Sequence, residues 1–112
     1  MQANYEQRLR LTFSKSGPAR YIGHLDLARV LERSFNRAKL PIAYTQGFNP
    51  HPRMQMATAL PLGTISEHEY ADIWMTTAMD PAAAQQLIMS KMAPGIDVYL
   101  VEDVPIKGKS LQ

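Results

Sequence analysis

The sequence contains no cysteine, and this absence removes several classes of chemistry at once. A chain without thiols forms no disulfide, holds no thiolate zinc site or iron–sulfur cluster by itself, and has no cysteine nucleophile. The absence also fits a reducing compartment, and we expect the cytoplasm. The sequence has no apolar run of about eighteen residues and no apolar segment of signal-peptide length near its start, so no membrane contact is expected.

The motifs of common enzymes are also missing. There is no glycine-rich phosphate loop, no pair of carboxylates at a recognisable spacing and no nucleophile elbow. The formal net charge is only +2, so overall charge does not identify a polyanionic partner. What the chain does have is the size and composition of one ordinary globular domain, with 112 residues of which 46% are hydrophobic and 20% charged.

Hydrophobic periodicity predicts six elements in the order β-α-β-β-α-β. The expected strands cover residues 8–13, 55–60, 70–75 and 96–101, and the expected helices cover about 23–40 and 81–93, with a short extended piece at 42–45. In the last strand, Ile96, Val98 and Leu100 alternate with Asp97, Tyr99 and Val101, which predicts that the first three share one face. Asp80 followed by Pro81 is a typical start for the second helix.

With right-handed crossovers, this order predicts a ferredoxin-like sandwich of the α+β class, in which two helices cover one face of a four-stranded antiparallel sheet. We expect this domain to span residues 1–104, followed at 105–112 by a linker or the start of a missing C-terminal half. The expected core consists of Leu9, Leu11, Phe13, Leu27, Leu31, Phe35, Ile73, Leu87, Ile88 and Val98.

Four segments together are similar to the radical-SAM-linked domain family, whose members occur with radical S-adenosylmethionine proteins. They are 10–18 (RLTFSKSGP), 23–27 (GHLDL), 47–52 (GFNPHP) and 60–63 (LPLG). The resemblance implies an accessory role beside a radical-SAM protein, with structured or ribosomal RNA as a candidate second partner. Any iron–sulfur cluster or S-adenosylmethionine would then belong to the partner, and no cofactor is expected in this chain. The resemblance supplies no catalytic residues.

Three arginines recur at helical spacing in the first expected helix. Arg29, Arg33 and Arg37 lie at i, i+4 and i+8, so they form one ridge. Each arginine offers a planar fork of donors that suits phosphate, which makes the ridge a candidate RNA-binding surface. The alternative is a solvated helix face that Asp26 and Glu32 partly neutralise.

His24 is the main candidate for catalysis. A neighbouring carboxylate, Asp26, would orient its imidazole for proton transfer, and Tyr21 and Lys15 lie close enough in sequence to assist. The competing interpretation makes His24 a helix-start residue that bonds to the backbone. A zinc site from His24, His51 and His68 is not expected, because no two of them have short ligand spacing on one element.

Two prolines flank His51, and each fixes a φ angle, so the surrounding loop is expected to be rigid. Rigid presentation lowers the entropy lost on binding, and we therefore expect Asn49, His51 and Arg53 to be binding residues. The amides that open a helix favour anions, so we further predict that this loop converges with His24 and Asp26.

Tyr70 and Trp74 share one face of an expected central strand. In an RNA-recognition sheet, aromatic side chains on the open face stack unpaired bases. The neighbouring strand offers arginines instead of a second aromatic, and the usual recognition-motif signature is absent. The alternative is that a missing second half or a partner subunit covers this face.

The sequence supports two main hypotheses and a weaker third. The first is a non-catalytic adaptor that binds a radical-SAM protein and positions RNA for it. The second is a metal-independent RNA-processing enzyme of the ferredoxin-like ribonuclease type that uses His24 with Tyr21 or Lys15. The third is a small-ligand or cobalamin-handling domain with His51 as the contact. Nothing in the sequence indicates an oligomeric state.

Overall fold

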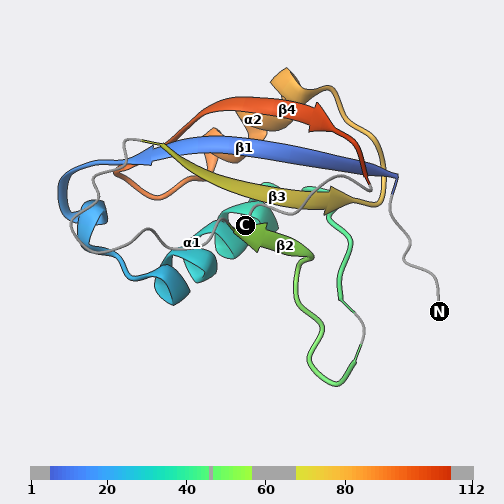
Figure 1. Cartoon of the computed structure of the whole chain (residues 1–112), viewed down its shortest axis with the longest axis horizontal. Helices are drawn as coiled ribbons and strands as arrows, with labels where there is room; N and C mark the ends of the chain where they lie inside the picture. Colours follow the sequence, from blue (N-terminus) through green and yellow to red (C-terminus); the bar gives the residue numbers. More distant parts are fainter. Residues whose placement is uncertain (1–5, 46, 57–67, 107–112) are drawn as a thin grey trace.

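A four-stranded antiparallel sheet and two helices form the fold in the computed structural model, which describes residues 6–45, 47–56 and 68–106 (Figure 1). The strands lie in the order β2-β3-β1-β4, and core residues from both helices pack on the same face of the sheet. The elements along the chain are β1 (Gln7–Lys15), the short 3-10 helix η1 (Gly17–Tyr21), α1 (His24–Arg37), β2 (Met54–Met56), β3 (Glu69–Met75), α2 (Pro81–Ser90) and β4 (Ile96–Val104). The predicted α+β, ferredoxin-like arrangement is confirmed.

Strand β1 lies inside the sheet and pairs with β3 on one side and with β4 on the other. Its residues Leu9, Leu11 and Phe13 are fully buried, as their alternation predicts. They join one core cluster with the apolar stripe of α1, whose buried members are Leu27, Leu31 and Phe35. The apolar face of α1 therefore packs on the apolar face of β1, and this contact forms the centre of the domain.

Helix α2 begins as the sequence predicts, because Asp80 Oδ2 accepts a hydrogen bond from Ala83 N at 3.1 Å. Its expected core residue Leu87, however, is 40% exposed, so that prediction is wrong. The buried residues Ala84 and Ile88 are four apart, and Gln85 Nε2 donates to Val98 O at 3.1 Å. The face of α2 that contacts the sheet is therefore centred on Ala84, Ile88 and Gln85, and Leu87 lies at the edge of that face.

Strand β4 contains a bulge that changes which of its residues face the core. Phe13 pairs with Val98 and Thr12 pairs with Leu100, so Tyr99 is an extra residue without a partner opposite it. The alternation shifts at this point, and Leu100 is 43% exposed while Val101 is buried. The predicted shared face of Ile96, Val98 and Leu100 is thus correct for the first two residues and wrong for the third.

The sheet edge beside β3 carries a hairpin that projects from the domain (Figure 1). Residues 42–45 pair with residues 51–53 through Thr45 N donating to His51 O at 2.8 Å and Arg53 N donating to Ala43 O at 2.7 Å. We call the described residues 42–45 and 47–53 the 42–53 hairpin. Both of its sides bond to the backbone of Trp74: Ala43 N donates to Trp74 O at 2.8 Å, and Trp74 N donates to Arg53 O at 3.2 Å. The predicted extended piece at 42–45 is present. The predicted strand 55–60 is observed up to Met56, and residues 57–60 lie outside the described part.

Candidate functional site

One face of the sheet is turned away from both helices, and we call it the open face. Strand register places Arg8 opposite Trp74, Arg10 opposite Asp72 and Thr12 opposite Tyr70. Because side chains alternate along a strand, these residues lie on the side opposite Leu9 and Leu11. On β4, Leu100 pairs with Thr12 and Glu102 pairs with Arg10, so both belong to the same face.

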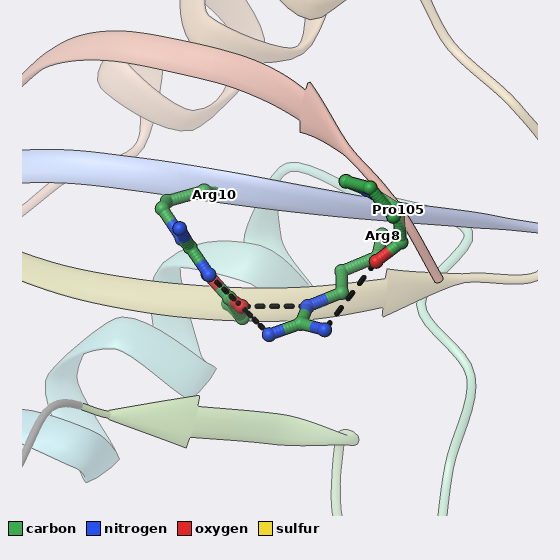
Figure 2. Close-up of polar contacts among 4 residues, drawn as sticks. Arg8, Arg10 and Pro105 are labelled. Atoms are coloured by element: carbon green, nitrogen blue, oxygen red, sulfur yellow. Dashed lines mark hydrogen bonds and ion pairs between the residues drawn. The ribbon is translucent and has the colours of Figure 1, made fainter. Parts of the chain in front are cut away.

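A carboxylate between two arginines occupies the middle of the open face. Arg8 Nε donates to Asp72 Oδ2 at 2.6 Å, and Arg8 Nη2 makes a further close contact with the same oxygen. Arg10 Nε donates to Asp72 Oδ1 at 2.8 Å, and its Nη2 donates to Oδ2 at 3.0 Å. Arg8 Nη1 also donates to Pro105 O at 3.3 Å, directly after β4 (Figure 2). We call Arg8, Asp72 and Arg10 the ion triad.

The two arginines of the ion triad differ in burial. The side chain of Asp72 is fully buried and that of Arg8 is 3% exposed, whereas 29% of the Arg10 side chain reaches the surface. The hydrogen bonds that Arg10 donates to Asp72 raise the pKa of Arg10, and the nearby Glu102 adds to this effect, so the guanidinium stays charged. One negative and two positive groups give the triad a net charge of +1, and Arg10 is the member through which solvent reaches it.

Trp74 connects the ion triad to the 42–53 hairpin. The Arg8 guanidinium lies 5.0 Å from the centre of the Trp74 ring, and the Arg53 guanidinium lies 5.4 Å from it. Both distances are within the range of a cation–π interaction. Arg53, which the sequence predicted as a binding residue, therefore belongs to the open-face site and adds positive charge to it.

Further along the open face, aromatic rings are exposed. Tyr70 is 40% exposed and Tyr99 is 39% exposed. The Tyr99 hydroxyl makes a close contact with Nδ1 of His68, and the two rings meet edge to face with centroids 5.7 Å apart. We call Tyr70, Tyr99 and His68 the aromatic patch. Together with the partly buried Trp74 it places several rings on one face, and RNA-recognition sheets in other proteins stack unpaired bases on rings arranged in this way.

The arginine ridge lies elsewhere on the domain. Arg29, Arg33 and Arg37 are all exposed on α1, and Arg29 Nη1 is 3.8 Å from Oδ1 of Asp26 with both side chains 72% exposed. Since α1 packs its apolar stripe on the helix-covered face of the sheet, its exposed side points away from the open face. The structure therefore does not bring the ridge and Tyr70 together.

The loop candidates also lie apart from the start of α1. Asn49 and His51 are exposed near the end of the 42–53 hairpin, and Phe48 beside them is fully exposed. Tyr44 in the same hairpin donates its hydroxyl proton to Asn36 Oδ1 at 2.9 Å, which places the hairpin beside the last turn of α1. Gly23 and the first turn of α1 lie at the other end of that helix (Figure 1). The predicted convergence of the two segments is not observed.

The catalytic candidates are spread over separate contacts. Lys15 Nζ forms an ion pair with Glu69 Oε2 at 3.0 Å, and Tyr21 is 82% exposed with the Arg20 guanidinium 5.8 Å from its ring. His24 opens α1, and its side chain lies outside the described part of the structure. Within the ranges that the structure describes, no group of three His, Asp or Glu residues is placed to hold a metal ion.

Sequence reasoning did not identify several members of the site, namely Arg8, Arg10, Asp72, Tyr99, His68 and Glu102. The signal for Asp72 was present, because it is the only carboxylate in the expected strand 70–75, and burying a carboxylate costs free energy unless cations lie opposite it. Arg8 and Arg10 alternate in the first strand and supply those cations, but the pairing of the two strands had to be known first. Tyr99 and His68 gave no comparable signal, since they are 31 residues apart in the sequence and only the folded chain brings them into contact.

The chain belongs to a bacterial family described as "Uncharacterized protein conserved in bacteria (DUF2344)", whose model matches residues 8–112. This match covers the open face, the arginine ridge and the 42–53 hairpin. Comparison with curated proteins found no match, and comparison with solved structures found none either. Neither helix of the described part has the length and apolar character needed to cross a membrane.

Proposed function

We propose that this domain is a non-catalytic module that binds single-stranded RNA on the open face and presents it to a radical-SAM protein. The observation that supports this proposal most directly is the aromatic patch beside the exposed guanidinium of Arg10. Rings that are about 40% exposed on a sheet can stack on bases, and the guanidinium of Arg10 beside them offers hydrogen-bond donors to an RNA strand. Unpaired bases have the flat faces that such a surface accommodates.

Binding of a short single-stranded RNA, measured by fluorescence anisotropy, tests this proposal. Tyr70→Ala and Tyr99→Ala should each weaken binding about 5- to 150-fold, because base–aromatic stacking is worth about 1–3 kcal/mol per base. The matched control is the triple alanine variant of Arg29, Arg33 and Arg37, which removes charge on the opposite side of the domain. A duplex RNA of equal length should bind more weakly than the single strand, since its bases are already stacked.

The same assay separates the open face from its rival surface. If the triple ridge variant loses binding and the slope against salt falls, while both tyrosine variants bind as the parent does, the RNA interface is the ridge on α1. A gel of the RNA after incubation adds an independent readout. Cleavage that disappears in a His24→Ala variant would replace the non-catalytic proposal with the RNA-processing enzyme.

The 42–53 hairpin is the surface that we assign to the protein partner. Its fully exposed Phe48 is an aromatic side chain of the kind that anchors protein interfaces, and the hydrogen bonds at the hairpin base hold it away from the sheet. A photoreactive phenylalanine analogue at position 48 should crosslink to a radical-SAM protein in cells. The same analogue at Leu87, an exposed apolar position on α2, is the control. Equal crosslinking at both positions, or none at position 48, would contradict this assignment.

A further inference from the structure

Arg10 has an unusual combination of fixed orientation and free donors. It contacts Asp72 through Nε and Nη2, which form the side edge of the guanidinium. The other edge, formed by Nη1 and the second proton of Nη2, has no hydrogen-bond partner among the residues that the structure describes. Because 29% of this side chain is exposed and Asp72 is fully buried, the end of the fork is turned outwards.

Two neighbours define what kind of group fits beside that fork. Tyr70 pairs with Thr12, two residues along β1 from Arg10, so its ring is the diagonal cross-strand neighbour of the guanidinium. Glu102 pairs directly with Arg10 from the other side, and its carboxylate raises the pKa of the arginine. A planar ligand stacked on Tyr70 would therefore meet two donors from Arg10 and an acceptor from Glu102.

We infer that Arg10 and Glu102 make the open face selective for guanine, an inference that rests on the proposed RNA binding. Guanine presents two adjacent acceptors, O6 and N7, to a bidentate arginine fork, and this is the commonest specific contact between arginine and a base. Its N1–H and N2 amino group are donors that a carboxylate accepts. Adenine presents a donor and an acceptor along the matching edge, so the fork of Arg10 is mismatched to it.

Glu102 is also the reason to assign Arg10 to a base and not to a phosphate. A phosphate offers only acceptors and negative charge, so the carboxylate of Glu102, which lies opposite Arg10 on β4, opposes phosphate binding. A guanine base has both acceptors and donors, and it carries no charge. Cytosine also offers two adjacent acceptors and an amino group, but it provides a single ring, which covers less of Tyr70 than a purine does.

The test uses a single-stranded oligoadenylate RNA in which one central base is adenine, guanine, cytosine, uracil, 7-deazaguanine or inosine. The affinity of each oligonucleotide for the full chain is measured by fluorescence anisotropy at one fixed salt concentration. The guanine oligonucleotide should bind about 5- to 150-fold more tightly than the all-adenine one. The 7-deazaguanine oligonucleotide, which lacks the N7 acceptor, should lose most of that preference. Inosine, which lacks the 2-amino group, should lose a smaller part.

Variants assign the preference to the two side chains. Arg10→Lys keeps the charge and a partner for Asp72 but removes the planar fork, so it should abolish the guanine preference while the all-adenine RNA still binds. Glu102→Gln should reduce the preference for guanine over inosine and leave the 7-deazaguanine effect intact. Melting of each variant, followed by circular dichroism, shows whether it is folded. The base-analogue series on the parent protein does not depend on any variant.

The outcomes separate this inference from the proposed function. Equal binding of all six oligonucleotides would overturn guanine selectivity while leaving RNA binding in place. A cytosine preference, or a loss of affinity in Arg10→Lys that is equal for every base, would overturn it as well, the second result because it assigns Arg10 to phosphate. No measurable binding to any of the oligonucleotides would overturn both the inference and the function on which it rests.

Discussion

The ion triad makes Asp72→Asn the most informative single change in this protein. The substitution keeps the shape of the side chain, removes its charge and replaces one acceptor oxygen with an NH₂ donor. In the parent, the fully buried carboxylate is the acceptor for both guanidinium groups of Arg8 and Arg10. In the variant, two like charges face each other across a neutral amide whose NH₂ group donates protons and accepts none. One of the cations, Arg8, is itself almost completely buried.

The expected cost follows from this burial. Removing one partner from a buried ion pair destabilises a protein by about 3–5 kcal/mol, because the remaining charge is left without compensation. At roughly 4–8 °C per kcal/mol for a domain of this size, the melting temperature should fall by about 12 °C or more. Urea unfolding followed by circular dichroism measures the free energy of unfolding directly, and an unchanged slope would show that the denatured state is unaffected.

Two further variants make the test specific. Asp97→Asn changes the same residue type at an exposed position of β4 and should shift the free energy of unfolding by less than about 0.5 kcal/mol. Replacing all three members of the ion triad with methionine or leucine should recover most of the loss, because an apolar set of similar volume removes the need for compensation. If Asp72→Asn is as stable as Asp97→Asn, the triad is not desolvated in solution and the argument from its burial is wrong.

Three other expectations follow from single features of the fold. Ile88→Ala should cost about 2–5 kcal/mol, whereas Leu87→Ala, one residue earlier on α2, should cost well under half as much, as chemical denaturation of both will show. Gly95→Ala should destabilise the domain by more than about 1 kcal/mol in a thermal melt, because Gly95 has a φ of 89° and a Cβ there would lie 2.7 Å from Ser16 O. An unchanged melt would mean that the backbone at Gly95 rearranges freely. The raised pKa of Arg10 gives a stabilisation that is present below the unfolded-state pKa and lost only as pH rises through the folded-state pKa. The difference in unfolding free energy between the parent and Arg10→Met should therefore be the same at about pH 7 and pH 9. A decline over that range would contradict a raised pKa for Arg10.

The fold was predictable because its central elements have clear and different periods. β1 alternates strictly and α1 carries its apolar residues at helical spacing, so each pattern allows one structure. The failures occur where two neighbouring residues are both apolar and the pattern no longer decides. Leu100 and Val101 are such a pair, and only the extra residue at Tyr99 determines which of them faces the core.

The candidate site was less predictable than the fold, and the reason is register. Tyr70, Trp74 and Arg53 were identified as separate candidates on the sequence. Their relation to Arg8 and Arg10 depends on which residue of β1 lies opposite which residue of β3, and a shift of one residue would turn every side chain to the other face. The predicted convergence of His24 with the 42–53 hairpin is not observed, for a related reason. Sequence patterns predict where helices and strands lie along the chain, but they do not predict which end of a helix a loop will contact.

The ion triad gives the domain a surface that an apolar face would not provide. Three apolar side chains in place of Arg8, Asp72 and Arg10 should give a comparable free energy of unfolding, so stability alone does not explain why these charges are there. An exposed arginine on an ordinary strand loses about 2 kcal/mol of rotamer freedom when it binds a ligand through its fork. In this domain Asp72 accepts hydrogen bonds from Arg10 before any ligand arrives, and Arg8, which also donates to Pro105 O, holds Asp72 in turn. Binding should therefore depend on Asp72 even though its carboxylate is fully buried and cannot touch an RNA base.

At a temperature where Asp72→Asn is still folded, it should lose discrimination between guanine and adenine while keeping the stacking contribution of Tyr70. Retention of full discrimination in that variant would show that Arg10 does not need its buried partner.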